Sequence, residues 1–488
     1  MSVRTRFAPS PTGFMHIGNL RTALYAYLFA RHYGGEFILR IEDTDEKRYV
    51  PGAVELIYRT LEASGFRIDE GPLNGGKYGP YVQSERKAIY QEYAQKLIEL
   101  GGAYYCFCDK ERLESLTDEN GNRKYDKHCL RLSPEEVKRK LEAGEEYVIR
   151  QNIPEHGMTE YEDMVYGRIS VDCADLEDNI LIKSDGMPTY NFANVIDDHL
   201  MGITHVMRGA EYLSSTPKYN LIYAAFGWEP PKYVHLPAIM KDAQHKLSKR
   251  YGDANFEDFI AKGYLPEAII NYIALLGWSP KSDLEKMDMA TLTELFGVEG
   301  ISKSGSIFDE PKMKWLNGLY VKELSAERFA GLAEPWYAES VVADKYDHAK
   351  WNALLQSRID IFSEIPEKVA FIEDFGEYDL ALYDHKKLKA DASVGYTAIN
   401  YAIEALEPLD VFDEESISAA FAAKAEEKGM KKGLLLWSVR VAITGYAVTP
   451  GGAVEMADIL GKEETLRRLR FSKELIERKG NVQNSRIS

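Results

Sequence analysis

The feature that constrains this chain most is a strand–loop–helix joint near its beginning. Residues 4–7 (RTRF) alternate in the manner of a short strand, and from Leu20 onward apolar side chains recur at helical spacing. Between them, residues 8–16 (APSPTGFMH) form a loop rich in Pro, Ser, Thr and Gly. A second strand, residues 37–42 (FILRIE), follows the helix. This order predicts a β-α-β unit, hence a parallel sheet with a right-handed crossover.

The position of the loop indicates where a ligand would bind. The loop after the first strand of such a unit lies at the carboxyl end of the sheet, where open α/β sheets bind ligands. It delivers His16 and Gly18 to a helix N-terminus, whose unpaired N–H groups and positive dipole end attract phosphate. A well-capped turn without a ligand has the same pattern, so a second feature is needed.

That second feature lies in a polar segment far downstream. Residues 241–250 (KDAQHKLSKR) have no apolar period and are typical of an exposed loop. Together the two segments resemble the HIGH and KMSKS motifs of class I aminoacyl-tRNA synthetases, here HIGN at 16–19 and KLSKR at 246–250. The text RFAPSPTG at 6–13 and RIEDTD at 40–45 resembles the glutamyl/glutaminyl branch, and the resemblance covers nearly the whole chain. Asn19 departs from the class motif, which has a second histidine there.

Composition limits the alternatives. A chain of 488 residues is too long for one core, and its four cysteines argue against a disulfide framework. No signal peptide or long apolar run is present, so we expect a cytoplasmic protein with no membrane association. The net charge of −17 does not favour a nucleic-acid partner, and the basic clusters at 424–432 and 467–473 have glutamates in or beside them. Charge alone therefore does not predict RNA binding.

The expected fold class is α/β. A Rossmann-type parallel-sheet catalytic domain carries an inserted lobe, and an all-helical C-terminal region follows. The resemblance implies that the lobe binds the tRNA acceptor end, that residues 253–325 contact the stem, and that the C-terminal region binds the anticodon. The expected boundaries are 1–102 and 186–252 for the catalytic halves, 103–185 for the lobe, 253–325 for a helical stem-contact domain, and 326–488 for the anticodon-binding domain.

The lobe contains a candidate metal site. Cys106, Cys108 and Cys129 have a spacing that fits a zinc knuckle, with Tyr125 or His128 as the fourth ligand. Three reduced structural thiols are the alternative. Some glutamyl-tRNA synthetases carry zinc in this lobe, and their pattern is similar to Cys106, Cys108, Tyr125 and Cys129.

The resemblance implies the chemistry of amino-acid activation, in which a carboxylate attacks the α-phosphorus of ATP. Such catalysis depends on positioning and on stabilising phosphate charge. We expect His16 at the ATP phosphates, Lys246 and Lys249 on the departing pyrophosphate, and Mg²⁺ bound with ATP. The expected ATP-binding residues are His16, Gly18, Asn19, Glu211, Lys246, Leu247, Ser248, Lys249 and Arg250.

Two arginines define the expected amino-acid site. Arg6 and Arg208 sit near the ends of predicted strands and can reach one cleft, where two guanidinium groups fit a substrate with two carboxylates. Glu42, at the end of the second strand, suits the substrate ammonium, and Asn194 is a further polar candidate. The resemblance implies that glutamate binds at Arg6, Ala8, Ser10, Glu42, Tyr190 and Arg208.

The expected function is therefore ATP-dependent charging of tRNA-Glu with L-glutamate by a monomeric enzyme. A glutaminyl-tRNA synthetase, or a glutamyl enzyme that also charges tRNA-Gln, shares the catalytic half. The anticodon region of glutaminyl enzymes resembles β-barrels, whereas residues 326–488 have a helical pattern. A small nucleotidylyltransferase would need neither the KLSKR segment nor three hundred further residues, and an RNA-binding protein without activity would need no paired phosphate motifs.

Overall fold

The predicted β-α-β unit is present at the start of the chain. β1 (Arg4–Phe7), α1 (Ile17–His32) and β2 (Glu36–Leu39) follow one another, and β1 pairs with β2 in parallel, with Arg6 opposite Ile38. The structure is a computed structural model that describes residues 2–45, 50–116, 124–247 and 255–485. Leu20, Leu24 and Leu28 of α1 are fully buried, so the helix covers the sheet with its predicted apolar face.

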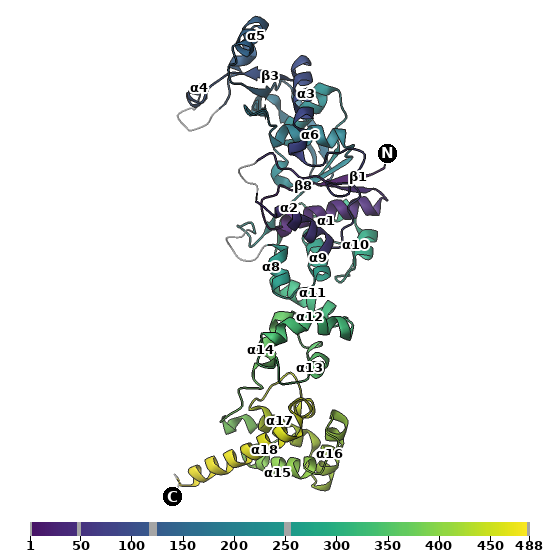
Figure 1. Ribbon diagram of the computed structural model, residues 1–488. Helices are drawn as coiled ribbons and strands as arrows, with labels where there is room; N and C mark the ends of the chain where they lie inside the picture. Colours follow the sequence, from purple (N-terminus) through teal and green to yellow (C-terminus); the bar gives the residue numbers. More distant parts are fainter. Residues whose placement is uncertain (1, 46–49, 117–123, 248–254, 486–488) are drawn as a thin grey trace. The chain divides into compact units, whose positions relative to one another are not determined.

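The second catalytic half extends this sheet. β8 (His205–Gly209) pairs in parallel with β9 (Lys232–Leu236), and β9 pairs in parallel with β5 (Met158–Asp163). A hydrogen bond from the Thr204 N–H to the Arg4 carbonyl, at 3.0 Å, joins β1 to the start of β8 (Figure 1). α6 (Tyr190–Leu200) and α7 (Thr216–Phe226) provide the helices of this half. The carboxyl ends of β1, β2 and β8 therefore meet on one side.

Two strands of the predicted lobe belong to this larger sheet. β5 and β6 (Gly167–Asp172) lie within residues 103–185, yet they are hydrogen-bonded beside β9 in the order β6-β5-β9-β8. A separate antiparallel sheet contains β3 (Ala103–Cys106), β4 (Val148–Gln151) and β7 (Ile180–Ile182). The expected domain boundaries stay a prediction.

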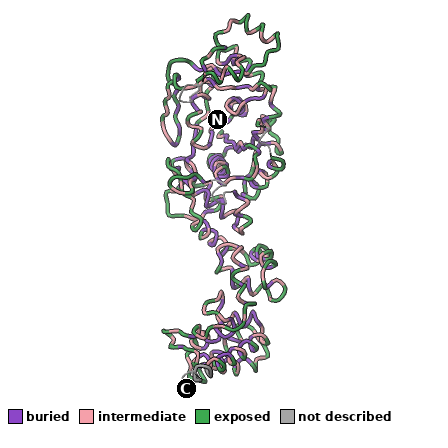
Figure 2. Tube along the Cα trace, turned by 90° about the vertical axis from the view of Figure 1, so that its left-hand side faces the viewer, coloured by how far each residue is buried: buried purple, intermediate pink, exposed green. Residues whose placement is uncertain are grey.

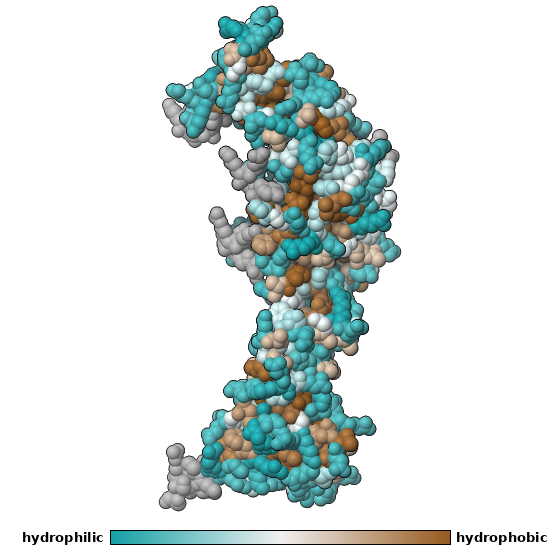
Figure 3. Space-filling model, in the orientation of Figure 1, coloured by the Kyte–Doolittle hydropathy of each residue, from teal (hydrophilic) through white to brown (hydrophobic). Residues whose placement is uncertain are grey.

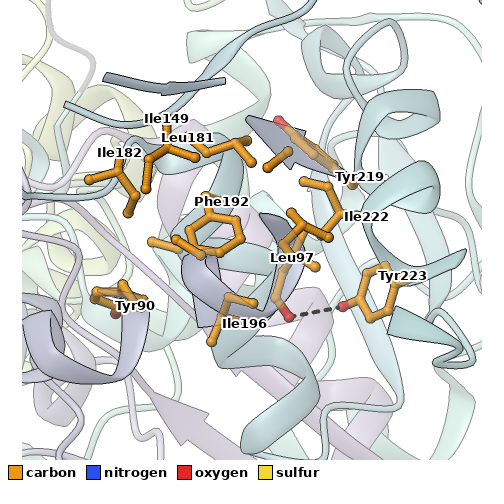
Figure 4. Close-up of a cluster of buried hydrophobic side chains, with 14 residues drawn as sticks. Tyr90, Leu97, Ile149, Leu181, Ile182, Phe192, Ile196, Tyr219, Ile222 and Tyr223 are labelled. Carbon is orange, nitrogen blue, oxygen red and sulfur yellow. Dashed lines mark hydrogen bonds between the residues drawn. The ribbon is translucent and has the colours of Figure 1, made fainter. Parts of the chain in front are cut away.

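A shared core joins the small sheet to the helices of the catalytic halves. Ile149 and Leu181 pack with Leu97 of α3 (Lys87–Glu99), Phe192 of α6 and Tyr219 of α7 (Figure 4). The buried apolar surface of such a cluster contributes about 25 cal/mol per Å² removed from water. The small sheet and the helices α3, α6 and α7 are thus stabilised by one hydrophobic cluster.

The remaining elements of the first unit are mostly helices. They are α2 (Ala53–Ala63), η2 (Gln83–Arg86), α4 (Lys110–Glu114), η3 (His128–Arg131), α5 (Pro134–Glu142), η4 (Cys173–Asp175), η5 (Ala210–Tyr212), β10 (Ile239–Met240), α8 (Phe256–Ala261), α9 (Pro266–Leu275), α10 (Met289–Leu295), η7 (Val298–Gly300) and β11 (Ser306–Ile307). This unit comprises Met1–Ala261 and Pro266–Met313.

The second unit comprises Lys262–Leu265 and Lys314–Ser488, and its described elements are helical, as the sequence predicts. α11 (Glu310–Val321) begins in the first unit, and its residues from Lys314 onward belong to the second. The others are α12 (Ala326–Ala338), α13 (His348–Leu355), η8 (Phe362–Glu364), α14 (Ile365–Ala370), η9 (Leu380–Tyr383), α15 (Ala392–Leu406), α16 (Glu414–Glu427), α17 (Lys432–Thr444) and α18 (Ala453–Ser485). α18 breaks at Gly461, whose φ of 76° is a left-handed conformation that favours glycine.

Burial follows this division. Figure 2 shows buried residues running through the interior of each unit, and Figure 3 shows hydrophilic side chains over most of the face it draws. Among the described residues, no helix is both long and apolar enough to cross a membrane.

Candidate active site

The loop after β1 presents a helix N-terminus, as the sequence predicts. His16 is the N-cap of α1, and its Nδ1 accepts a hydrogen bond from the Gly18 N–H at 3.0 Å. An accepting Nδ1 places the ring proton on Nε2, so the neutral ring is a donor on its other side. A Cβ at position 18 would lie 3.1 Å from this Nδ1, which explains the glycine. The α1 N-terminus and His16 together form an anion-binding corner.

A cavity of about 960 Å³ opens beside this corner. Its volume is at the upper end of what small-molecule sites occupy. The predicted site residues that line it are Arg6, Ala8, Ser10, His16, Gly18, Asn19, Glu42, Tyr190, Arg208, Glu211, Lys246 and Leu247. The structure therefore brings most of the predicted ATP and glutamate residues to one place.

One predicted residue with a described position does not line this cavity. Asn194 does not line the cavity, because it is buried within α6 and its amide donates to the Tyr190 carbonyl, one turn earlier, at 2.5 Å. Asn194 as a substrate contact stays a prediction. Ser248, Lys249 and Arg250 lie outside the described residues.

Lys246 reaches the cavity from a short hairpin. Its backbone bridges Met240 of β10, and the Leu247 N–H donates to the Ile239 carbonyl at 3.0 Å. The carboxylate of Asp242 accepts the N–H groups of Gln244 and His245 at the turn of this hairpin. Lys246 itself is exposed, as an ammonium that meets a phosphate from solvent should be.

A buried ion network lies under the predicted amino-acid site. Arg6 donates to both carboxylate oxygens of Asp198, at 3.0 and 3.3 Å, and Arg40 pairs with Asp198 at 2.7 Å and Glu42 at 3.0 Å. Burial raises the pKa of Glu42, although Arg40 and Arg6 oppose this. Burial also opposes the charge of Asp198, but Arg6 and Arg40 outweigh it and hold the pKa of this carboxyl below its usual range.

This network changes the predicted electrostatics of the site. Two cationic guanidinium groups were expected in the cavity, but Asp198 already compensates the charge of Arg6. Sequence reasoning missed Asp198. Two adjacent aspartates inside the largely apolar segment 190–200 were the available signal, because acidic residues are rarely buried unless paired.

Arg208 is held differently. It is 5% exposed, and its Nε donates to Nε2 of His235 at 3.1 Å, while Nη2 donates to the Thr216 hydroxyl at 2.7 Å. The rings of Tyr212, Tyr219 and Tyr233 lie about its guanidinium, 4.9 to 5.3 Å from their centroids. Burial opposes its charge, but Tyr190, Tyr219, Tyr233 and Asp198 together raise its pKa above the usual value. The groups in direct contact with the guanidinium, which are His235, Thr216 and the three tyrosine rings, are uncharged.

The predicted cysteines form a compact cluster. The sulfurs of Cys106, Cys108 and Cys129 lie within 4.8 Å of one another, with 3.5 Å between those of Cys108 and Cys129. The Tyr125 hydroxyl lies 3.3 Å from the Cys106 sulfur and 3.4 Å from that of Cys108. Among the described residues His128 does not join this cluster, which leaves Tyr125 as the nearby fourth group.

The donor set fits a metal ion. Zn–S bonds of about 2.3 Å in tetrahedral geometry separate two sulfurs by about 3.8 Å. The cysteine cluster has similar spacing, and Arg150 Nε donates to the Cys106 sulfur at 3.2 Å. Hydrogen bonds from Cys129, Tyr125 and Arg150 outweigh burial and lower the pKa of the Cys106 thiol below its usual range. A thiolate is the form that binds metal.

Comparisons with known proteins agree with this geometry. Residues 2–315 match a family described as "tRNA synthetases class I (E and Q), catalytic domain", and residues 328–472 match one described as "Anticodon binding domain". The chain is 55% identical over 471 residues to a glutamate–tRNA ligase of Clostridium novyi (strain NT), covering 96% of this chain and 97% of that protein. It is 53% identical over 480 residues to that of Clostridium acetobutylicum, covering 98% and 99%.

A solved structure is similar over the same length. The glutamate–tRNA ligase of Elizabethkingia meningosepticum, crystallised in complex with its amino acid, superposes with a TM-score of 0.86 at 36% identity, covering 97% of this chain and 99% of that chain. With its cavity, its two motif segments and these full-length similarities, the chain belongs to the glutamate–tRNA ligase family of class I aminoacyl-tRNA synthetases.

Proposed function

We propose that this chain activates L-glutamate with ATP and transfers it to the 3′ end of tRNA-Glu, releasing AMP and pyrophosphate. The observation that carries this proposal is Arg208, a buried guanidinium without a carboxylate partner among the described residues, in the same cavity as the phosphate-binding corner at His16. A buried cation held only by neutral groups is suited to a substrate that brings its own negative charge.

The amino acid is bound by residues at the strand ends. Arg208 donates hydrogen bonds to the side-chain carboxylate of glutamate, and Glu42, held by Arg40, accepts hydrogen bonds from the α-ammonium. Arg6, with its charge balanced by Asp198, orients the substrate as a hydrogen-bond donor. Ala8, Ser10 and Tyr190 complete the proposed glutamate site.

Activation is an in-line attack of the α-carboxylate of glutamate on the α-phosphorus of ATP. The α1 N-terminus and the Nε2–H of His16 hold the phosphates, while Lys246 neutralises the charge that grows on the departing pyrophosphate. Lys249 shares this role by its place in the KLSKR motif, with Gly18, Asn19, Glu211, Leu247, Ser248 and Arg250 as further ATP contacts. Mg²⁺ bound to ATP supplies additional phosphate neutralisation.

Transfer needs the tRNA to be held at both of its ends. The match of residues 328–472 to an anticodon-binding domain supports a role of the helical second unit in binding the anticodon. The 3′ hydroxyl of the tRNA then attacks the glutamyl-adenylate carbonyl and expels AMP. We infer that a monomer in the cytoplasm carries out both steps.

The cysteine cluster is proposed to hold one structural zinc ion. Cys106, Cys108 and Cys129 supply three sulfurs and Tyr125 the fourth ligand. The metal would fix the lobe between β3 and η3, which carry these cysteines or adjoin them.

Product stoichiometry tests the proposed function. Purified protein is incubated with ATP, Mg²⁺, tRNA-Glu and labelled glutamate, and AMP, pyrophosphate and charged tRNA are each measured. The proposal predicts equal amounts of the three. Release of ADP and phosphate, or AMP release without charged tRNA, contradicts it.

A further inference from the structure

A buried Asp–His pair lies beneath Arg208. Asp163 ends β5 and His235 lies on the neighbouring strand β9, and both side chains are 0% exposed. The Asp163 Oδ2 is 2.6 Å from the Nδ1 of His235 and 3.2 Å from its backbone nitrogen. The other oxygen accepts the N–H groups of Val165 and Tyr166 at 2.9 and 2.8 Å. Four N–H donors thus hold this carboxylate in its ionised form.

This contact fixes the tautomer of His235. A carboxylate only accepts hydrogen bonds, so the ring proton lies on Nδ1 and Nε2 has a lone pair. Arg208 Nε, 3.1 Å away, donates to that lone pair. The Thr216 hydroxyl donates to the Tyr212 carbonyl at 2.7 Å and accepts from Arg208 Nη2. Both groups that orient the guanidinium are therefore neutral acceptors.

A neutral hydrogen-bond acceptor orients an arginine without compensating its charge, whereas a carboxylate acceptor compensates it. Arg6, Arg40 and Arg86 each pair directly with Asp197 or Asp198, so their charges are compensated inside the protein. At Arg208 the imidazole of His235 stands between the guanidinium and Asp163. Asp163 orients the His235 ring and the ring orients Arg208, so Asp163 and Arg208 form no direct ion pair with each other. The arrangement orients a buried cation and keeps its charge available to a ligand.

We propose that Asp163 and His235 are positioning residues that orient Arg208 toward the substrate's side-chain carboxylate and so favour glutamate over its neutral isostere glutamine. This inference rests on the proposed function. It adds two residues that touch neither substrate nor ATP, and their contribution is made through Arg208.

Replacement of Asp163 by Asn tests the tautomer. If the amide NH₂ of the new asparagine faces Nδ1 of His235, the ring proton moves to Nε2 and opposes the Arg208 Nε–H. If the NH₂ faces the other way, the NH₂ opposes the N–H groups of Val165 and Tyr166. We expect the KM for glutamate in tRNA charging to rise roughly 10- to 100-fold, the range for a lost hydrogen bond to a charged group. The KM values for ATP and tRNA should change less than about twofold.

A matched pair at position 235 separates positioning from packing. The side-chain oxygen of His235→Gln can reach the place of Nε2 and accept from Arg208, so this variant should retain most of the wild-type KM for glutamate. The amide of His235→Asn ends near the place of Nδ1 and cannot reach Arg208, so it should resemble Asp163→Asn. If Asp163→Asn does not fold, the comparison of His235→Gln with His235→Asn alone tests the positioning role.

Measuring the tautomer of His235 provides a readout that a change in packing alone does not alter. The chain has 10 histidines, and His235→Gln identifies the His235 signals in ¹⁵N-histidine NMR spectra. We expect a protonated Nδ1 in the wild type and a shift of the proton toward Nε2 in Asp163→Asn.

The outcomes distinguish this inference from the proposed function. Equal defects in His235→Gln and His235→Asn, or equal rises in the KM for glutamate, ATP and tRNA, overturn the positioning role while charging by the wild type stands. A wild-type protein that does not charge tRNA with glutamate overturns the proposed function itself.

Discussion

Replacing Arg208 with glutamine removes the one charge in the proposed glutamate site that no described carboxylate compensates. In the proposed glutamate complex, the substrate's side-chain carboxylate completes a desolvated ion pair with this guanidinium. Truncation of one partner of such a buried pair costs roughly 2–5 kcal/mol, so kcat/KM for glutamate should fall roughly 30- to 5,000-fold. The amide nitrogen of glutamine ends near the place of Arg208 Nε and can still donate to His235, while the Thr216 contact, which is made by Nη2, is lost.

The amino-acid preference gives the sharper readout. The neutral amide of glutamine leaves Arg208 buried and unpaired in the wild type, a penalty that Arg208→Gln removes. Charging with glutamine should therefore fall much less than charging with glutamate, which narrows the ratio of their kcat/KM values. The assay is steady-state charging of tRNA-Glu with each labelled amino acid, with the KM for ATP as an internal reference.

Arg6→Gln is the matched control. Because Asp198 already balances Arg6 at 3.0 Å, its loss should weaken binding but narrow the glutamate-to-glutamine ratio less than the loss of Arg208 does. Arg208→Lys keeps the charge without the planar guanidinium, so its kcat/KM for glutamate should lie between the values of wild type and Arg208→Gln. Unchanged kcat/KM for glutamate in Arg208→Gln, or an equal narrowing in Arg6→Gln, would refute the reasoning.

Three further predictions concern the lysine loop, the metal and the pH dependence. Lys249→Ala should lower kcat for activation by roughly 10²-fold or more with a smaller change in the KM for ATP; near-normal kcat with a raised KM contradicts a transition-state role. Metal analysis should find about one zinc per chain in protein prepared without chelators, and less in Cys129→Ser; no metal in the wild type ends the zinc proposal. Burial, aided by Lys232, lowers the pKa of His205 to about 4. The unfolded chain therefore takes up this proton first as pH falls from about 6.5 to 4, and the free energy of unfolding should drop by at most about 1.4 kcal/mol per pH unit for this residue. Urea denaturation against pH should show a shallower slope in His205→Asn, and an identical slope contradicts the assignment.

The elements of the catalytic half could be predicted because local pattern determines them. The alternation of residues 4–7, the loop punctuation and the helical spacing from Leu20 all act over short sequence distances. The convergence of His16, Lys246 and Arg208 on one cavity followed from parallel-sheet topology together with the family resemblance.

What the sequence could not show are pairings between distant residues. The compensation of Arg6 by Asp198 joins positions 192 residues apart, and the Asp163–His235 contact spans 72. Neither pair has a local pattern, because each depends on which strands become neighbours. Likewise, β5 alternates like any half-buried strand, and only its register with β9 shows that it belongs to the larger sheet. The sequence also could not show that the Asn194 amide donates to the Tyr190 carbonyl, because a polar residue on a helix can bond to its own helix backbone.

The central claim is that this site selects glutamate and delivers it to tRNA-Glu. The most direct measurement is charging of purified tRNA-Glu and tRNA-Gln by the full chain, with labelled glutamate and, separately, labelled glutamine. The account predicts that glutamate is attached to tRNA-Glu and that glutamine is attached to neither tRNA, because its amide leaves Arg208 unpaired. Glutamate on tRNA-Gln as well would identify a non-discriminating enzyme with the same amino-acid site. Charging with glutamine at a rate comparable to glutamate would contradict the account.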